Sequence, residues 1–359
     1  MTEPLVLAQR YAGRQRRLAV TAVAAALREW RSLDSADLRA SWAVVGPRLF
    51  TVLSAAQLSA ATGADDYVTA AAASQGAAPQ PDAATVDAAA FSGVAADGRP
   101  LDTLLSRPLV MTYRALAQGH SVAESLGAGQ NLLGTIVRSE VADAGRQAVG
   151  VAMTGLRTIQ GYVRVVQPPA CSRCIILAGR EYGWNAGFQR HPRCDCIHLP
   201  TTLVARRQHR GGLHGDSFSP HTAPGGTARG FVSPRAYFDS LSTTEQDRVF
   251  TQAGARAIRQ GADMSQIVNA RRGMHTTTAY GRRVAATREG TTRRGSFYRS
   301  ERARTEQRTG TRFARSRSEV GRLPTFHLRS PRLLPEEIYR LAEDREDAIR
   351  MLRRFGYLT

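Results

Sequence analysis

The sequence contains no lysine: all 49 basic residues are arginine, against 30 acidic residues, and the formal net charge is +19. A GC-rich genome that replaces lysine with arginine explains the missing lysine, but it does not explain the excess of positive charge. Arginine binds phosphate through paired hydrogen bonds and stays charged when partly buried. The charge imbalance therefore indicates an acidic partner, either nucleic acid or an acidic protein surface.

The sequence also lacks a run of 18 or more apolar residues, so we expect no membrane-spanning helix. Arg14–Arg17 followed by Leu18–Leu27 resembles a secretory signal peptide. However, Val23, Leu27 and Trp30 share one face of a helix, which favours an amphipathic helix. We therefore expect a reducing compartment, where clustered thiols favour metal binding over disulfides.

Cysteine is scarce, and its distribution is uneven. The four cysteines fall in Cys171-Ser-Arg-Cys174 and in the later stretch His191-Pro-Arg-Cys194-Asp-Cys196. Two closely spaced pairs separated by a loop of about twenty residues are typical of a structural zinc site. The candidate ligands are Cys171, Cys174, His191, Cys194 and Cys196.

Zinc takes four ligands in a tetrahedron, so the five candidates leave a choice. Four thiolates form the simplest site, three thiolates with His191 are nearly as good, and His198 is a weaker candidate. Either set is closed to water, so the predicted Zn²⁺ is structural and holds together a knuckle too small to fold by packing alone. Unliganded thiols and two disulfides are the alternatives, although Cys194 and Cys196 are too close to pair easily with each other.

The hydrophobic pattern predicts a mainly α fold in which a helical domain precedes a small α+β or β-ribbon knuckle and a basic, partly disordered tail. Leu38, Trp42, Val45, Leu49 and Val52 form one helical stripe, which Gly46-Pro47 is expected to kink or split. The predicted segments are a helical domain at 1–160, the zinc knuckle at 161–202, a flexible linker at 203–233, a short helical segment at 234–274, an Arg-rich flexible arm at 275–332 and a C-terminal helix at 333–359.

The spacing of apolar residues changes from that of a helix to that of a strand at the start of the predicted knuckle. A long helix is expected at about 128–157, and Gly161–Val166 then reads as a β-strand that leads into Cys171. Residues 271–332 contain seventeen arginines against four glutamates and no aspartate, a net of +13. That excess predicts a flexible arm able to touch DNA phosphates without sequence preference.

The cysteine segment resembles the signature of the Mu F-like phage head morphogenesis proteins, which are minor capsid proteins of tailed phages. The shared elements are Cys171-x-x-Cys174, Leu177-Ala-Gly179, His191-Pro-x-Cys194-x-Cys196 and a closing Pro200. The signature spans about thirty residues, and the helical region upstream resembles the family in type only. The stretches 236–248 and 268–274 are similar to tails of minor head proteins of phages that infect actinobacteria, a host that also fits the arginine-only composition.

The resemblance implies a few copies inside the procapsid, close to the portal, that act in head assembly. The implied partners are the portal protein and the capsid and scaffold proteins, with packaged double-stranded DNA as a further contact of the arm. The implied location is the virion head, and the bacterial cytoplasm during assembly. No membrane partner and no enzymatic activity are expected.

Other classes of function remain open at this stage. Some relatives carry a capsid maturation protease, but His214-Gly-Asp-Ser217 lies in the predicted linker and His120-Ser121 has no paired acid at a telling spacing. A fused toxin is disfavoured because the tail has few core residues. A nucleic-acid-binding zinc knuckle would stack bases on aromatic side chains, and Tyr182, Trp184 and Phe188 lie between the cysteine pairs. These aromatics serve equally well as a small core beneath the metal.

Overall fold

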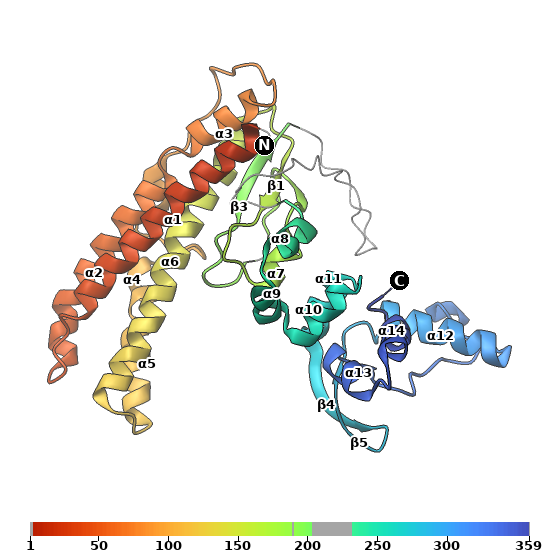
Figure 1. Ribbon diagram of the computed structural model, residues 1–359. Helices are drawn as coiled ribbons and strands as arrows, with labels where there is room; N and C mark the ends of the chain where they lie inside the picture. The colour runs from red at the N-terminus through yellow and green to blue at the C-terminus, as the bar shows by residue number, and fades with distance from the viewer. Residues whose placement is uncertain (1–2, 189, 203–231, 359) are drawn as a thin grey trace. The chain divides into compact units, whose positions relative to one another are not determined.

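The computed structural model describes residues 3–188, 190–202 and 232–358 (Figure 1). The chain divides into two compact units, the first made of residues 1–170 and 177–233 and the second of residues 171–176 and 234–359. The described residues are mainly helical, with two small antiparallel sheets ordered β2-β1-β3 and β4-β5-β6. The predicted linker at 203–233 lies almost entirely outside the described residues.

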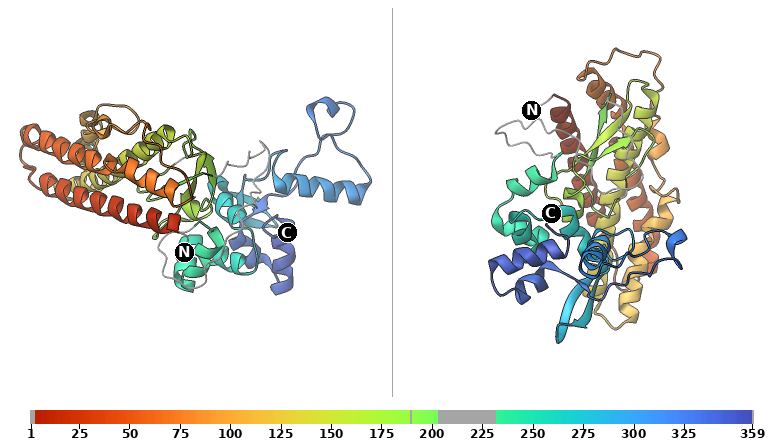
Figure 2. Two further views of the ribbon diagram at one scale, coloured as in Figure 1. Left: turned by 90° about the horizontal axis from the view of Figure 1, so that it is seen from above. Right: turned by 90° about the vertical axis from the view of Figure 1, so that its right-hand side faces the viewer.

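The first unit is built on long helices. The helix α6 packs against α1, α2, α3 and α5, and the views in Figures 1 and 2 agree that α1, α2 and α6 run side by side. The helices are α1 (Glu3–Trp30), α2 (Leu38–Ala61), α3 (Ala64–Ala73), α4 (Leu101–Leu105), α5 (Arg107–Ala117) and α6 (Val122–Gly155), with a 3₁₀ turn η1 (Ala88–Phe91).

The core of this unit forms from the predicted apolar stripes. Val45 and Leu49 of α2 are buried with Leu133 and Val137 of α6, and the partly buried Trp42 packs against the same cluster. Alanines on α1 let the helices approach closely at the buried positions Ala19, Ala22 and Ala26. Burial of these faces stabilises the unit by roughly 25 cal/mol for each Å² of apolar surface removed from water.

One local prediction for the first unit is wrong. Gly46-Pro47 was expected to kink or split the second helix, but α2 continues through Pro47 as one helix. The N-cap of α2 is Asp37, whose side chain accepts a hydrogen bond from the Ala40 N–H at 2.9 Å. Tertiary packing of the stripe outweighs the one backbone hydrogen bond that proline removes.

The first sheet follows α6 directly. Its strands are β1 (Gly161–Val165), β2 (Glu181–Gly183) and β3 (Ile197–Thr201), and β1 is central and antiparallel to both neighbours. All five residues of β1 are buried. A short helix, α7 (Ser172–Ile175), lies between β1 and β2 in the chain.

The second unit contains short helices around a three-stranded sheet. Its helices are α8 (Pro234–Ser240), α9 (Thr243–Phe250), α10 (Gln252–Arg259), α11 (Met264–Ala270), α12 (Ser296–Thr309), α13 (Pro335–Leu341) and α14 (Arg345–Arg354). Its strands are β4 (Met274–Ala279), β5 (Arg282–Thr287) and β6 (Arg332–Leu333), with 3₁₀ turns η2 (Arg271–Gly273) and η3 (Arg317–Glu319). The expected C-terminal helix is present as two helices, since α13 ends at Leu341 and Asp344 caps α14.

The Arg-rich segment 275–332 was expected to be a flexible arm, and here the structure differs. It forms β4, β5 and α12 and contributes the buried side chains of Val284, Phe297 and Phe326. Arg332 is 1% exposed and donates to the carbonyl oxygens of Phe355 at 2.8 Å and Glu289 at 3.0 Å. A few apolar residues spaced among the arginines supply a core that the average composition conceals.

One helical stretch, Leu38–Ala73, is long and apolar enough to pass a length-and-composition test for a membrane span. This is weak evidence, because the core helix of a soluble protein passes the same test. The stretch includes the buried faces of α2 and α3 and is interrupted at Gly63, which has a φ of 83°.

Candidate metal centre

The predicted ligands lie around the first sheet, and its topology brings them together. In the register of β1 and β3, Val165 pairs with Ile197 and Arg164 pairs with His198. Because the two strands are antiparallel, the end of β1 lies beside the start of β3. In the chain, Cys171 follows β1 and Cys196 directly precedes β3.

The first pair of thiols is placed by the single turn of α7. Cys171 is the N-cap residue, and its carbonyl accepts a hydrogen bond from the Ile175 N–H at 3.1 Å. Cys174 lies within the turn and is buried, whereas Cys171 is exposed.

The second pair follows a tight turn. The Cys194 N–H donates to the His191 carbonyl at 3.2 Å, and Arg193 adopts a left-handed backbone with a φ of 64°. Cys194 and Cys196 are 3% and 2% exposed. The turn therefore buries both thiols of the HPxCxC motif and leaves His191 partly exposed at its start.

The five candidate ligands fall into two groups of ligand atoms. Cys171, Cys174 and His191 form one group, and the buried thiols Cys174, Cys194 and Cys196 form the other. Within each group the atoms lie within 4.8 Å of one another, and Cys174 belongs to both. A tetrahedral zinc with bonds to sulfur of about 2.3 Å needs sulfur–sulfur distances of about 3.8 Å, so small movements would close either set.

The chemistry of these donors fits a soft, closed metal site. Three buried thiols with a further thiol and an imidazole nearby match the sulfur-rich sets that hold structural zinc. The cluster could therefore hold a metal ion, with the fourth position contributed by Cys171 or His191. Metal would stabilise thiolates that are otherwise costly to bury.

Arg164 places a positive charge directly against two of these sulfurs. Its Nη2 lies 3.4 Å from the Cys196 sulfur and 3.8 Å from the Cys194 sulfur, and the residue is 1% exposed. Its guanidinium carbon lies 4.2 Å from the centroid of the Phe188 ring. A buried cation favours the thiolate form of neighbouring cysteines and offsets the net negative charge of a zinc–thiolate centre.

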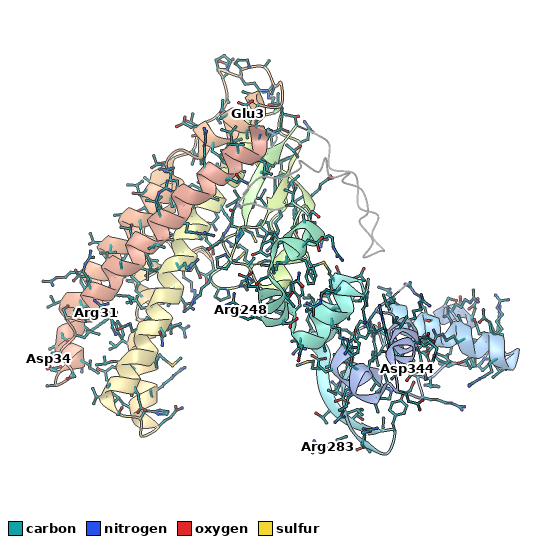
Figure 3. All side chains as sticks on the ribbon, in the orientation of Figure 1. Glu3, Arg31, Asp34, Arg248, Arg283 and Asp344 are labelled. Atoms are coloured by element: carbon teal, nitrogen blue, oxygen red, sulfur yellow. The ribbon has the colours of Figure 1, made fainter. Side chains whose placement is uncertain are left out.

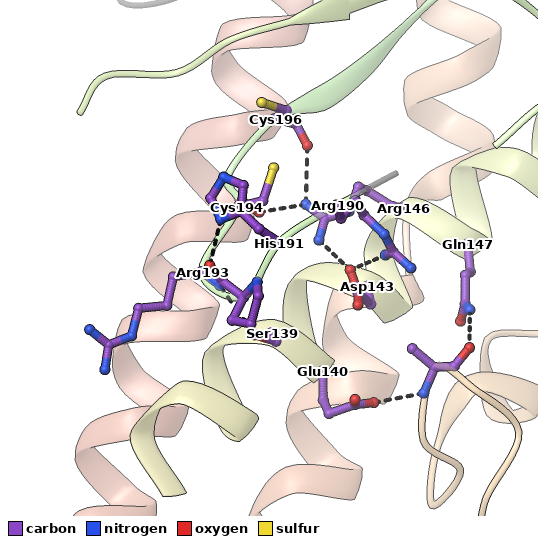
Figure 4. A network of polar contacts seen from close by, with 12 residues as sticks. Ser139, Glu140, Asp143, Arg146, Gln147, Arg190, His191, Arg193, Cys194 and Cys196 are labelled. Carbon is purple, nitrogen blue, oxygen red and sulfur yellow. Dashed lines mark hydrogen bonds and ion pairs between the residues drawn. The ribbon is translucent and has the colours of Figure 1, made fainter. Parts of the chain in front are cut away.

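A second arginine fixes the loop that carries the sulfurs (Figure 4). Arg146 of α6 donates from Nη1 to the carbonyl oxygens of Cys194 at 2.8 Å and Cys196 at 3.1 Å. The carboxylate of Asp143 pairs with both Arg146 and Arg190. Burial lowers the pKa of the Arg190 guanidinium, while the Asp143 charge acts in the opposite direction.

Further polar contacts join the knuckle, residues 161–202, to the helices of the first unit. Arg138 of α6 donates to Asp195 at 2.5 Å, and Arg193 donates to the Thr135 hydroxyl at 2.7 Å. From α3, the Tyr67 hydroxyl donates to the His198 carbonyl at 2.7 Å. The position of the knuckle on the helices is thus set by several directional bonds as well as by packing.

The aromatic residues of the knuckle form mainly a small core. Tyr162 stacks on Tyr182 at 5.1 Å between ring centroids, and Phe188 is 9% exposed and packs against both rings. The ring centroids of His198 and Tyr162 lie 4.1 Å apart. Burial, with nearby arginine charges, lowers the pKa of His198 to about 3. Trp184 is 43% exposed. The described residues of the loop therefore do not present the several exposed aromatic rings that a base-stacking platform needs.

The sequence identified all five residues of the two groups, and His198 falls in neither. Sequence reasoning missed Arg164, Arg146 and Asp143, which surround the sulfurs and their loop. Arg164 could have been found, because it is the single charge inside the apolar run Gly161–Val166. Arg146 and Asp143 carry no such signal, since charged residues on a long helix usually face solvent.

The residues considered for a protease have other roles or lie elsewhere. Ser121 caps α6 and donates to the Glu124 carboxylate at 2.7 Å, which helps to lower the pKa of that carboxyl. His214 and Ser217 lie outside the described residues.

Comparison with known proteins identifies a family. The family model described as VG15 protein matches residues 5–212, which is more than half of the chain. The chain belongs to the VG15 protein family. The matched range spans the helices of the first unit and the whole knuckle, including every candidate ligand.

The VG15 family is a viral one, so this is a phage or viral protein. No curated protein and no solved structure matches the chain.

Proposed function

We propose that this VG15 protein is a non-enzymatic minor head protein of a tailed phage or prophage, and that it acts in head assembly near the portal. The observation that carries the proposal is a viral family match that covers the helices and the cysteine knuckle together. A viral structural or assembly role agrees with that family. The Mu F-like arrangement of the knuckle motif and an actinobacterial host are part of the proposal.

The metal in this proposal is a structural Zn²⁺. Three thiolates, Cys174, Cys194 and Cys196, would hold it together with Cys171 or His191. Bound zinc would cross-link the loop to the turn of α7, and a closed ligand set leaves no position for a reacting water. The residues of the chain do the remaining work, since Arg146 and Arg138 attach the loop to α6.

The proposed partners are the portal protein and the capsid and scaffold proteins, which would contact the helical surface of the first unit. The Arg-rich part of the second unit is proposed to contact packaged double-stranded DNA. The protein would then be found inside the virion head and, during assembly, in the bacterial cytoplasm.

The test is a phage that carries Cys171→Ser. We expect it to yield few infectious particles and to lose co-purification of the protein with the portal, because the first turn of the knuckle loses a metal-binding thiol. Arg173→Ala is the matched control, since Arg173 is an exposed residue of the same turn and belongs to neither ligand group. Normal titres from the Cys171→Ser phage, with a portal-free protein in both strains, would overturn the proposal.

A further inference from the structure

The strands β4 and β5 form a regular hairpin in the second unit. They pair from Met274 opposite Thr287 to Ala279 opposite Arg282, and the turn residues Tyr280 and Gly281 have φ values of 53° and 73°. Positive φ at both turn positions matches the right-handed twist of the strands. Six residues at about 3.3 Å each give a ribbon about 20 Å long.

The base of the hairpin is joined to the turn that precedes α12. The Arg288 N–H donates to the Gly273 carbonyl at 3.0 Å, and the Tyr298 N–H donates to the Gly290 carbonyl at 3.0 Å. Figure 3 labels Arg283 at the outer end of the same hairpin. Exposed arginines therefore stand at the base, at the outer end, where Arg282 and Arg283 face opposite sides of β5, and in the following turn. We call this set the hairpin surface: Arg272, Arg282, Arg283, Arg288, Arg293 and Arg294.

The positive charge of the hairpin surface is not neutralised locally. Among the described residues, none of its six arginines forms an ion pair. The carboxylates of the adjacent α13 are engaged elsewhere, since Glu336 pairs with Arg271 at 2.5 Å and Glu337 pairs with Arg340. In residues 271–300, Glu289 is the single acidic residue.

We propose that the hairpin surface binds the phosphate backbone of double-stranded DNA without sequence preference. Duplex DNA carries one negative charge for about every 1.7 Å of its axis, so a ribbon of this length faces several phosphates at once. Thr278 is exposed and pairs with Arg283 across the hairpin, and hydroxyl side chains are common phosphate ligands.

An acidic protein surface fits these residues less well. The exposed apolar side chains Met274 and Tyr280 stand at opposite ends of β4, which leaves no apolar centre between them. Protein–protein interfaces bury such a centre and surround it with charge. The inference rests on the DNA contact in the proposed function. It assigns that contact to a folded hairpin instead of a flexible arm.

The test uses the full-length protein and a random 30-base-pair duplex carrying a fluorophore. We expect replacement of all six arginines of the hairpin surface by glutamine to weaken binding about ten- to a hundredfold at moderate salt. The slope of log affinity against log salt should also fall, because fewer counterions are released. The matched control replaces six exposed arginines of the first unit and thus removes the same charge: Arg28, Arg31, Arg39, Arg107, Arg114 and Arg157.

The control variant should retain most of the affinity and the full salt slope. Circular dichroism and thermal unfolding establish that both variants fold. Equal losses in the two variants would show binding by net charge alone and would overturn the inference, as would loss of binding to a polyglutamate probe with no change toward DNA. Purified protein suffices for this test, so its failure leaves the portal and Cys171→Ser experiments unaffected.

Discussion

Arg164 is a permanently charged side chain buried against sulfur. It is 1% exposed, and the interior strand β1 holds its backbone, because the Arg164 N–H donates to the Arg180 carbonyl at 2.9 Å and the Arg164 carbonyl accepts from Gly179 at 2.9 Å. The side chain cannot easily withdraw from Cys194 and Cys196. A positive charge held beside these two sulfurs should stabilise their metal-bound thiolate form.

We therefore expect Arg164→Gln to lower the affinity for zinc by about ten- to a hundredfold, the range seen when residues supporting metal ligands are removed. Competition against a chromophoric chelator measures the affinity for zinc. Arg173→Gln removes the same charge from an exposed position beside Cys174 and should leave the affinity nearly unchanged. Equal affinities of the two variants would exclude a role for Arg164 at the metal.

The fourth ligand can be assigned by a pair of substitutions. We expect Cys171→Ser to lower zinc affinity by at least about tenfold and His191→Asn to lower it far less, because the turn of α7 already holds Cys171 beside Cys174 and four thiolates form a closed site. Native mass spectrometry of both variants measures bound zinc. The reverse order of effects would assign the fourth position to His191.

Glu140 of α6 predicts a dependence of stability on pH. Burial raises the pKa of its carboxyl, and the residue is 9% exposed and accepts a hydrogen bond from the Ala96 N–H at 2.8 Å. A raised pKa means that the folded state binds the proton more tightly. Its contribution to stability is therefore complete below the unfolded pKa and is lost as pH rises through the folded value.

Glu140→Gln keeps an acceptor for Ala96 but cannot ionise. We expect the free energy of unfolding of this variant, relative to the original protein, to improve as pH rises from below the ordinary pKa of a carboxyl group to above it. Urea unfolding at a series of pH values measures the difference. A difference that stays constant across this range would contradict the assigned direction.

At the scale of elements, glycines on α6 decide how closely its neighbours pack. A Cβ atom at Gly129 would lie 2.3 Å from the Thr112 hydroxyl and 2.6 Å from the Trp30 ring. At Gly127, two residues earlier on the same helix, a Cβ atom would meet nothing within 4 Å. Alanine would favour the helix at both positions, so the two substitutions differ in the space available to the added methyl group.

We expect Gly129→Ala to reduce the free energy of unfolding by about 1–3 kcal/mol through overpacking. The matched variant Gly127→Ala should instead gain up to about 1 kcal/mol, because alanine favours the helix. Chemical denaturation of the two proteins gives both values. A stabilising Gly129→Ala would mean that α5 and α1 shift readily to admit a methyl group.

At the scale of the whole molecule, the helices and the knuckle depend on different interactions. The main described core cluster of the first unit draws its side chains from the segment before residue 145 and includes none from the knuckle. The knuckle has a small aromatic core and the two ligand groups. Small units of this kind usually need a metal to fold.

Removal of metal should therefore open the knuckle and leave the helices folded. With a chelator, we expect most of the helical circular dichroism to remain while chymotrypsin cuts faster near Tyr182 and Phe188. Added zinc should restore protection in the original protein but not after Cys174→Ser. Unchanged cleavage on chelation would show that packing alone holds the knuckle.

The sequence by itself indicated the long helices of the first unit, a strand at 161–166, which the structure has as Gly161–Val165, and the five candidate ligands. Helical stripes and a strand run depend on local periodicity, and the ligands are the residues in their segment whose chemistry binds soft metals. The helical segment predicted at 234–274 is present as α8 to α11, but the sequence did not determine the fold of residues 275–332. There Val284, Phe297 and Phe326 are isolated in an arginine-rich segment, and only long-range packing shows that they form a core.

Tertiary structure also decided what surrounds the metal site. The antiparallel register of β1 and β3 brings Arg164 to the sulfurs, and Arg146 reaches the same loop from α6, about 50 positions earlier in the chain. The position of Arg146 carries no local signal for its partner, because the energy of a buried charge depends on what the fold places beside it. Residue types thus indicated the candidate ligands, and the three-dimensional arrangement determined which charges surround them.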